Sequence, residues 1–258
     1  MVNKICIIAG EPSGDLYAGR VVAELKKNRP DLDVFGIGGE KMISGGLEAI
    51  YHLNQLSFMG IAEVVKNLPL IRRVMKRMTD EIKTRKPDVL VLVDYPGFNL
   101  KLMQKVREYC KKIIYFISPQ LWAWGKHRIN KIRKYVDEML VIFPFEEDFY
   151  RNEKVNAKFV GHPLVELLNE KSFSDKNSFF QKYNFNDRKK LIAVFPGSRR
   201  QEIKKHMPVI EETVRLLSAK SNVNIGIAVS PYIGSEIFNK LISSDNVSLI
   251  TDDRHNLL

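Results

Sequence analysis

The sequence predicts an α/β fold in which parallel strands alternate with helices, and three observations support this class. Residues 89–93 form an apolar run without a polar break, as expected of a strand buried on both faces of a sheet. Short apolar runs alternate with longer helical stretches, which is typical of a doubly wound parallel sheet. The glycine-rich turn 10–15 joins the first apolar run to a helical stretch, as in the opening unit of a Rossmann-like domain.

The elements of the first domain follow from these runs and from the turn residues between them. Strands are expected at 5–9, 34–37, 89–93, 113–117, 139–143 and 159–160, with a short strand or extended passage at 47–53. Helices are expected at 16–27, 61–85, 100–111 and 126–134. Pro69 suits a first helical position, so the second helix should break or restart there, and Asn99 suits the N-cap of the third.

A domain junction is expected at Gly161-His162-Pro163, which divides the chain into residues 1–161 and 162–258. A second sheet should begin at 191–195, followed by a helix to about residue 218, strands at 225–229 and 247–250, and a helix at 237–242. About three strands bury too little apolar surface to close a core. We therefore expect the second Rossmann-like domain to be incomplete and the sequence to be truncated.

The composition narrows the classes of function. A formal net charge of +11 indicates an anionic partner, such as a phosphorylated ligand, a membrane surface or nucleic acid. The two cysteines form no Cys-x-x-Cys pair, and no His-Glu-x-x-His motif is present, which argues against a disulfide framework and a metal site. The first apolar run is too short for a signal peptide or a spanning helix. We expect a soluble cytoplasmic protein with at most a peripheral membrane contact.

Asp94 is the first candidate for chemistry. It follows the buried run 89–93 directly and precedes Pro96 and Gly97, which cannot continue a strand. Open α/β sheets bind ligands at the carboxyl ends of their strands, so this carboxylate should lie at the ligand crevice. An aspartate that merely caps a turn is the plainer interpretation. The burial of the strand behind it leads us to favour a functional role.

The second candidate is the turn Pro196-Gly197-Ser198-Arg199, which lies between a buried run and the start of a helix. The free N–H groups of a helix start, the helix dipole and a guanidinium fork together suit a pyrophosphate. An ordinary strand-to-helix turn with a surface arginine would have the same position. Because glycine, serine and arginine all favour an anion site, we prefer the functional interpretation.

Seven short motifs, taken in their order along the chain, resemble those of the lipid A disaccharide synthase family. They are Ala-Gly-Glu-Pro-Ser-Gly-Asp at 9–15, Phe-Met-Gly at 58–60, Asp-Tyr-Pro-Gly-Phe-Asn at 94–99, Ser-Pro-Gln-Leu-Trp-Ala-Trp at 118–124, Phe-Pro-Phe-Glu at 143–146, Gly-His-Pro at 161–163 and Pro-Gly-Ser-Arg at 196–199. Each motif is weak alone, but seven in order are specific and cover essentially the whole chain.

The resemblance implies a glycosyltransferase of the GT-B type, with an active site in the cleft between two Rossmann-like halves. In that family UDP-2,3-diacylglucosamine donates its sugar to 2,3-diacylglucosamine 1-phosphate. The products are the β-1,6-linked lipid A disaccharide 1-phosphate and UDP, and the anomeric carbon is inverted. The implied partners are the two acylated sugars and the cytoplasmic surface of the inner membrane, with a homodimer left open, no nucleic acid, no metal and no cofactor.

The same resemblance implies roles for individual residues. Asp94 would be the general base for the acceptor hydroxyl, and Arg199 would stabilise the departing diphosphate. Donor binding is implied for Gly197, Ser198, Arg199 and Gln120, and acceptor binding for Ser13, Gly14, Asp15 and Met59. Trp122 and Trp124 match the same motif as Gln120, and structural packing is an equal interpretation for these two side chains.

Two other classes of protein are considered, and in one motif the sequence differs from the family. Another GT-B enzyme, such as a UDP-N-acetylglucosamine 2-epimerase, would share the architecture and the nucleotide. A basic nucleic-acid-binding protein would explain the charge, but no RNP, KH or helix-turn-helix signature is present. Family members continue through a Ser-Gly-Thr-x-x-Leu-Glu motif that is absent here, so part of the uridine site is expected to be missing.

The helix expected near 69–86 is a candidate for membrane contact. At 100° per residue, one face should pack on the sheet and is formed by Leu68, Ile71, Met75, Met78 and Ile82. Leu70 and Val74 should lie on the shoulder beside Arg73 and Arg77, as an interfacial helix requires. Packing of both apolar side chains on a neighbouring loop is an equally weighted interpretation.

Overall fold

The computed structural model describes residues 2–55, 67–170, 173–197, 200–220, 222–230, 237–238 and 246–257. The chain divides into two compact units, unit 1 from Met1 to Leu168 and unit 2 from Asn169 to Leu258. This division lies slightly beyond the junction expected at Gly161, because helix α8, Pro163–Asn169, begins within unit 1.

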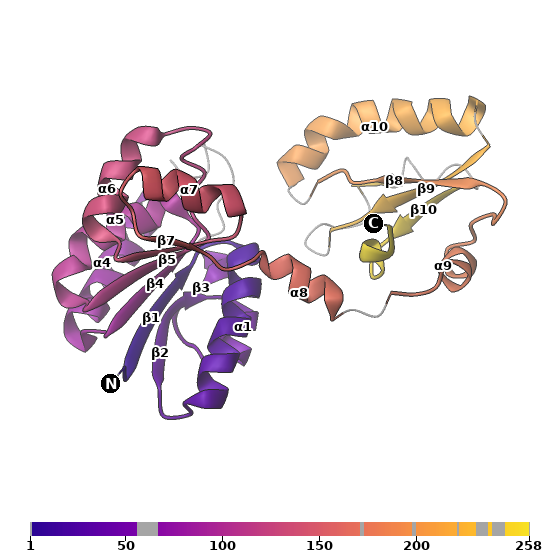
Figure 1. Cartoon of the computed structure of the whole chain (residues 1–258). Helices are drawn as coiled ribbons and strands as arrows, with labels where there is room; N and C mark the ends of the chain where they lie inside the picture. The colour runs from indigo at the N-terminus through magenta and orange to yellow at the C-terminus, as the bar shows by residue number, and fades with distance from the viewer. Residues whose placement is uncertain are drawn as a thin grey trace. The chain divides into compact units, whose positions relative to one another are not determined.

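Unit 1 is built on a parallel sheet, which has seven strands among the described residues (Figure 1). The strands are β1 Lys4–Ala9, β2 Asp33–Gly38, β3 Glu48–His52, β4 Val89–Val93, β5 Lys112–Phe116, β6 Glu138–Val141 and β7 Ala157–Phe159. Their order across the sheet is β3-β2-β1-β4-β5-β6-β7. The direction of winding therefore reverses between β1 and β4, which is the switch point where such sheets bind ligands.

Helices cover both faces of this sheet. They are α1 Pro12–Asn28, α2 Glu40–Ser44, α4 Leu68–Arg85, α5 Pro96–Val106, α6 Ile129–Tyr135 and α7 Pro144–Asn152, with short 3₁₀ turns at Leu53–Gln55, Arg107–Tyr109 and Lys126–Arg128. Apolar side chains of α4, α5, α6 and α7 form one core with the sheet, and those of α1 and α2 form a second core on the opposite face. Figure 1 shows α4, α5 and α6 on one side of the sheet and α1 on the other. Pro12, Pro96 and Pro144 each stand in the first turn of a helix that follows a strand, where a missing N–H costs nothing.

An apolar hollow of about 1040 Å³ lies on the α1 face of the sheet. Its lining includes side chains of five strands, among them Ile5, Val91, Ile114, Leu140 and Phe159. Its walls include Leu25 of α1 and Val165 of α8, and Asp94 is not among its lining residues.

Two expectations about helices in unit 1 are wrong. Asn99 is not an N-cap: α5 begins at Pro96, and Asn99 is buried within its first turns. The expected packing face of α4 is wrong in part. Met78 and Ile82 are completely buried, and Ile71 and Met75 pack against the same core, as expected. Leu68 is exposed instead, and Val74, which was expected on the shoulder, is completely buried; full burial of such a side chain contributes about 1.5–3 kcal/mol.

Unit 2 contains a smaller parallel sheet, of three strands among the described residues, in the order β10-β9-β8. The strands are β8 Lys190–Val194, β9 Val223–Ala228 and β10 Val247–Ile250. The helices are α9 Lys176–Lys182 and α10 Arg200–Lys220, with a 3₁₀ turn at Arg254–Leu257 (Figure 1). Ile203, Met207 and Val214 of α10 pack on β9 and β10 in a single core cluster, so this unit has its own apolar core.

Candidate functional site

The carboxyl edge of the unit 1 sheet brings together motifs that are far apart in the sequence. Strands β1, β4, β5, β6 and β7 are consecutive neighbours and all run parallel. The segments that follow them are 10–15, 94–99, 118–124, 143–146 and 161–163. Because parallel strands all end at the same edge, these five motifs meet along one side of the sheet. Asp94 lies at the end of β4, directly beside the switch point.

Asp94 is held in an unusual backbone conformation. Asp94 and Tyr95 both have positive φ angles, 44° and 48°, in the left-handed region that costs a non-glycine residue about 1–2 kcal/mol. The Asp94 carbonyl oxygen accepts hydrogen bonds from the Tyr115 hydroxyl and from Asn99 Nδ2, each at 2.7 Å. Its amide donates to the carbonyl of Phe116 at 3.0 Å. The surrounding structure therefore fixes the turn that presents the Asp94 side chain.

Two tyrosines next to Asp94 remain protonated at neutral pH. Burial, reinforced by the charge of Asp94, raises the pKa of Tyr115 well above its ordinary value. Burial and the charge of Glu11 raise the pKa of Tyr95. A Cβ atom on Gly10 would come within 2.1 Å of the Tyr95 ring, so a glycine is required where the β1 turn passes this ring. The turns after β1 and β4 are thus packed directly against each other.

The glycine-rich turn after β1 has a clear structural role. The Asp15 carboxylate is buried and accepts hydrogen bonds from the amides of Gly39, Met42 and Lys41 at 2.7, 3.1 and 3.2 Å. These bonds satisfy the free N–H groups at the start of α2, as an N-cap would. Acceptor binding by Ser13, Gly14 and Asp15 stays a prediction: Ser13 is exposed, and Gly14 is buried inside α1.

Glu146 is a buried carboxylate at this edge to which the sequence analysis gave no role. It is 1% exposed, and its Oε1 accepts from the Ser118 hydroxyl at 2.7 Å and from Trp122 Nε1 at 3.3 Å. Its Oε2 accepts from the Phe143 amide at 3.3 Å, and this bond closes the first turn of α7. The acidic residue at the third position of a helix that follows a strand was the available signal. Glu146 fastens the 118–124 turn to α7.

The 118–124 turn carries the remaining predicted site residue of unit 1. The Tyr150 hydroxyl donates to the Pro119 carbonyl at 2.8 Å, so the base of the turn is fixed from α7. The Gln120 side chain is exposed. The backbone carbonyl of Gln120 accepts from the backbone amides of Ala123 and Trp124 at 3.1 and 3.3 Å. Gln120 is therefore presented on a firmly held turn beside the end of β5, where a donor-binding role stays a prediction.

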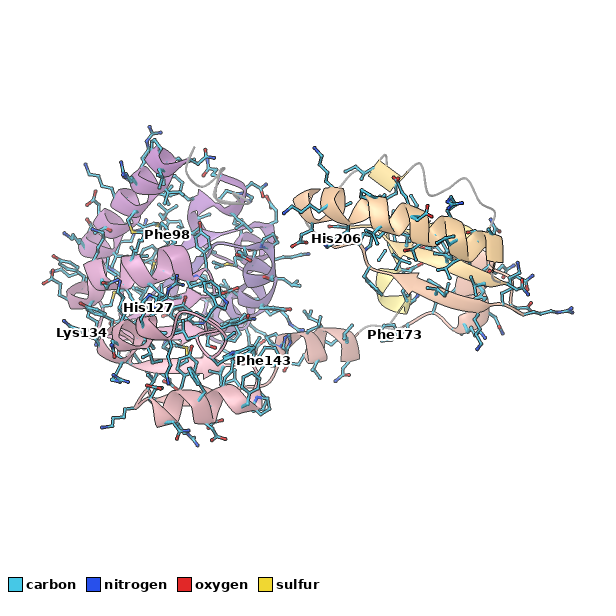
Figure 2. All side chains as sticks on the ribbon, turned by 90° about the horizontal axis from the view of Figure 1, so that it is seen from above. Phe98, His127, Lys134, Phe143, Phe173 and His206 are labelled. Carbon is cyan, nitrogen blue, oxygen red and sulfur yellow. The ribbon has the colours of Figure 1, made fainter. Side chains whose placement is uncertain are left out.

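The second candidate turn lies in unit 2. Gly197 follows β8 with φ of 121°, a left-handed conformation that suits glycine. The Pro196 carbonyl oxygen lies 3.0 Å from His206 Nδ1, which fixes the turn to α10 (Figure 2). Ser198 and Arg199 lie outside the described residues, as does Met59 of the predicted acceptor site. Among the described residues, no group of three or more His, Cys, Asp or Glu side chains comes together as a metal site would require.

The predicted membrane shoulder on α4 requires a correction. Val74 is completely buried in the core between α4 and the sheet, and Leu70 is half-buried against the same core. Arg73 and Arg77 are exposed, and Arg77 forms an ion pair with Glu81 at 2.6 Å. Val74 therefore packs on protein, because Val74, Met78 and Ile82 together form the buried face of this helix against the sheet. No helix among the described residues combines the length and apolar character needed to cross a membrane.

Comparison with solved structures identifies the class of fold. The chain is similar to the UDP-GlcNAc 2-epimerase from Neisseria meningitidis bound to UDP-GlcNAc, with a TM-score of 0.62 and 15% sequence identity. The likeness covers 98% of this chain and 74% of that one. Two α/β units with parallel sheets thus form a GT-B type fold, as the sequence predicted.

Comparison of sequences identifies the family. The chain belongs to the lipid-A-disaccharide synthetase family, whose sequence pattern matches residues 5–255. It is 38% identical over 234 residues to the lipid-A-disaccharide synthase of Myxococcus xanthus, which covers 90% of this chain and 61% of the relative. It is 39% identical over 221 residues to that of Coxiella burnetii, with 85% and 58% covered. The resemblance seen in the seven motifs is confirmed, and the chain spans about three fifths of the length of these relatives.

Proposed function

We propose that this protein is an inverting glycosyltransferase of lipid A biosynthesis. It joins UDP-2,3-diacylglucosamine to 2,3-diacylglucosamine 1-phosphate, giving the β-1,6-linked disaccharide 1-phosphate and UDP. The observation that carries the proposal is the family match over residues 5–255, combined with Asp94 at the switch point of a GT-B type fold. The 2-epimerases share the fold at only 15% identity, so they do not offer a better-supported activity.

In the proposed reaction Asp94 accepts the proton of the acceptor 6-hydroxyl as that oxygen attacks the anomeric carbon. A sugar hydroxyl is a poor nucleophile until its proton is accepted, so an inverting transfer needs such a base. The fixed left-handed turn at Asp94 supports this role, because a base must be held in one position relative to the hydroxyl.

The diphosphate of the donor is assigned to unit 2. Gly197 leaves the backbone free to approach a phosphate at the start of α10, a helix of 21 residues whose dipole favours an anion. We assign Arg199 to the departing diphosphate, with Ser198 and Gln120 as further donor contacts. Ser13, Gly14, Asp15 and Met59 are assigned to the acceptor side.

We also propose that the protein acts in the cytoplasm, at the inner surface of the inner membrane. Its acylated substrates must be taken from a bilayer, and the net charge of +11 favours an anionic lipid surface.

The proposal is tested by UDP release. We would incubate both acylated sugars with the 258-residue protein, and with this chain joined to the C-terminal part of the Myxococcus xanthus relative. UDP should appear only when donor and acceptor are both present. In the more active form, Asp94→Asn should lower turnover by roughly two to four decades, and Arg199→Lys should impair use of the donor because it loses the planar fork.

Two results would contradict the assignment. If neither protein releases UDP in the presence of both sugars, the chain does not carry this activity. If the Asp94→Asn variant keeps near-normal turnover while binding both substrates, Asp94 is a turn residue and another group accepts the proton.

A further inference from the structure

An exposed aromatic surface lies at the carboxyl edge of unit 1 and has no role in the proposed chemistry. We call it the aromatic rim; it consists of Trp122, Trp124, Phe143 and Phe145, which are 44%, 63%, 37% and 50% exposed. The Trp122 and Phe145 rings meet edge to face at 5.2 Å, and Phe145 stacks on Phe143 at 5.8 Å. These contacts join Trp122, Phe145 and Phe143 into one apolar surface from two separate segments, and Trp124 lies two residues after Trp122 on the same turn. Exposed apolar patches of this kind mark interaction sites.

The ring of Trp122 is exposed although its polar atom is bonded inward. Trp122 has one polar side-chain atom, Nε1, and it donates to the buried carboxylate of Glu146 at 3.3 Å. What remains exposed of this side chain is therefore its apolar ring. Burying a carboxylate is costly unless its hydrogen bonds are made, so Glu146, Ser118 and Trp122 form one fixed unit. The position of Trp122 in the rim is therefore fixed by its hydrogen bond to Glu146 and by its ring contact with Phe145.

Cations follow the rim directly along the chain. The segment 122–135 contains five Lys and Arg residues and no acidic residue: Lys126, Arg128, Lys131, Arg133 and Lys134. The Arg128 guanidinium lies 5.3 Å from the centre of the Trp124 ring. Glu153 forms ion pairs with Lys126 and Arg133, at 2.8 and 3.3 Å, so this acid offsets part of the charge. On the Phe145 side, α7 carries Glu147, which pairs with Arg151, and the exposed Asp148, so the excess of positive charge lies on the 126–134 side of the rim.

We propose that the aromatic rim is the surface by which this protein docks on an anionic lipid bilayer. Tryptophan is favoured at the level of the lipid headgroups, where its ring is apolar and its N–H is polar. Basic residues beside an apolar surface add attraction to anionic lipid. The inference deepens the proposed function, since both acylated substrates come from a bilayer, and it places the contact at this edge instead of on the buried Val74 of α4.

The chain contains a built-in probe for this contact. Its two tryptophans, Trp122 and Trp124, both belong to the rim. Intrinsic fluorescence therefore reports on the rim alone. Vesicles of phosphatidylethanolamine and phosphatidylglycerol should shift the emission to shorter wavelength, and brominated acyl chains in those vesicles should quench it. Vesicles of phosphatidylcholine alone should have a much smaller effect, because they carry no net charge.

Two variants keep both tryptophans and test the rim and its cations. Phe145→Ala removes a half-exposed ring and should weaken vesicle binding about tenfold. This factor corresponds to the free energy of burying the exposed half of a phenylalanine side chain, or more of it, in the bilayer. Arg128→Gln should weaken it on the order of fivefold, and this loss should vanish at high salt. Phe173→Ala is the matched control, because Phe173 is also 50% exposed and belongs to unit 2 (Figure 2). It should bind vesicles as the unaltered protein does.

Several results would overturn the inference. One is an emission spectrum that anionic vesicles neither shift nor quench, and another is an equal loss of binding in Phe145→Ala and Phe173→Ala. If dispersed acylated sugar shifts the tryptophan emission to shorter wavelength and vesicles do not, the rim binds substrate chains. The vesicle assay needs no catalysis, so its failure with intact UDP release rejects the docking surface alone. Vesicle binding without UDP release in either protein form rejects the proposed function alone.

Discussion

Replacement of Glu146 by glutamine tests whether a buried carboxylate holds the edge of the site together. Glutamine has nearly the same shape, but it offers one acceptor oxygen and places an NH₂ group where the second oxygen was. Its oxygen can still accept from Ser118 and Trp122. Its NH₂ group then faces the amide of Phe143, and two donors confront each other in a site that is 1% exposed.

The expected cost follows from these contacts. A hydrogen bond to a charged group contributes about 1.5–3 kcal/mol, and one such bond is lost outright in Glu146→Gln. The two remaining bonds become weaker because the acceptor is neutral. We expect the free energy of unfolding of unit 1 to fall by about 2 kcal/mol, which lowers Tm by about 4–8 °C for a domain of this size.

Thermal unfolding and tryptophan quenching measure this effect. Glu147→Gln is the matched control, because Glu147 lies on the same helix, accepts from the Phe159 amide at 2.9 Å and pairs with Arg151 in a more exposed position. It should cost less than about 1 kcal/mol. In Glu146→Gln alone, iodide should quench the tryptophans more strongly, because Trp122 Nε1 is held less firmly.

Equal Tm values for the two variants, with unchanged quenching by iodide, would refute this reasoning. They would mean that Ser118 and Trp122 keep their positions without the carboxylate. The 118–124 turn would then be held by its own backbone and by the Tyr150 hydroxyl on the Pro119 carbonyl.

Two further predictions concern the ends of the strands. Asp88 accepts from Lys111 at 2.6 Å and from the amides of Asn3 and Lys4, and these bonds, led by that of Lys111, hold its pKa well below the ordinary value. A carboxyl group whose pKa is lowered by folding stabilises the folded state at pH values above its pKa in the unfolded chain. The difference in unfolding free energy between the unaltered protein and Asp88→Asn should therefore be constant above about pH 5 and shrink below about pH 4. Urea unfolding that gives the same difference at every pH would contradict this expectation. Gly10→Ala places a Cβ atom 2.1 Å from the Tyr95 ring and should cost about 1–3 kcal/mol. In the Tyr95→Ala background the same change should cost almost nothing, and an undiminished cost there would show that the clash lies elsewhere.

Most strands could be predicted from the sequence, and so could the strand end at which Asp94 lies. The apolar run 89–93, with Pro96 and Gly97 after it, located β4 and put Asp94 at its carboxyl end. The parallel order of the strands then brings this residue beside the turn after β1. The positions of β4 and of Asp94 depend on neighbours along the chain, so local patterns of apolar and turn residues are enough to reveal them, whereas the order of the strands is a tertiary feature.

Other features depend on which groups lie opposite each other in space, and the sequence does not express them. The sequence placed Met78 and Ile82 on the packing face of α4, but only packing on the sheet showed that Val74 is buried with them and that Leu68 is exposed. Asn99 has the chemistry of an N-cap, yet in the structure its amide donates to the carbonyls of Val93 and Asp94 from inside α5.

The clearest contrast is between Asp94 and Glu146. The sequence by itself determined the fold class, the family motifs and the position of Asp94 at a strand end, because each depends on residues that are close together along the chain. Only the tertiary structure decided that Glu146 points inward and that the tryptophan rings of the rim point outward. A buried carboxylate must find its hydrogen-bond donors wherever the fold supplies them, and here they come from a turn 24 to 28 residues earlier in the chain.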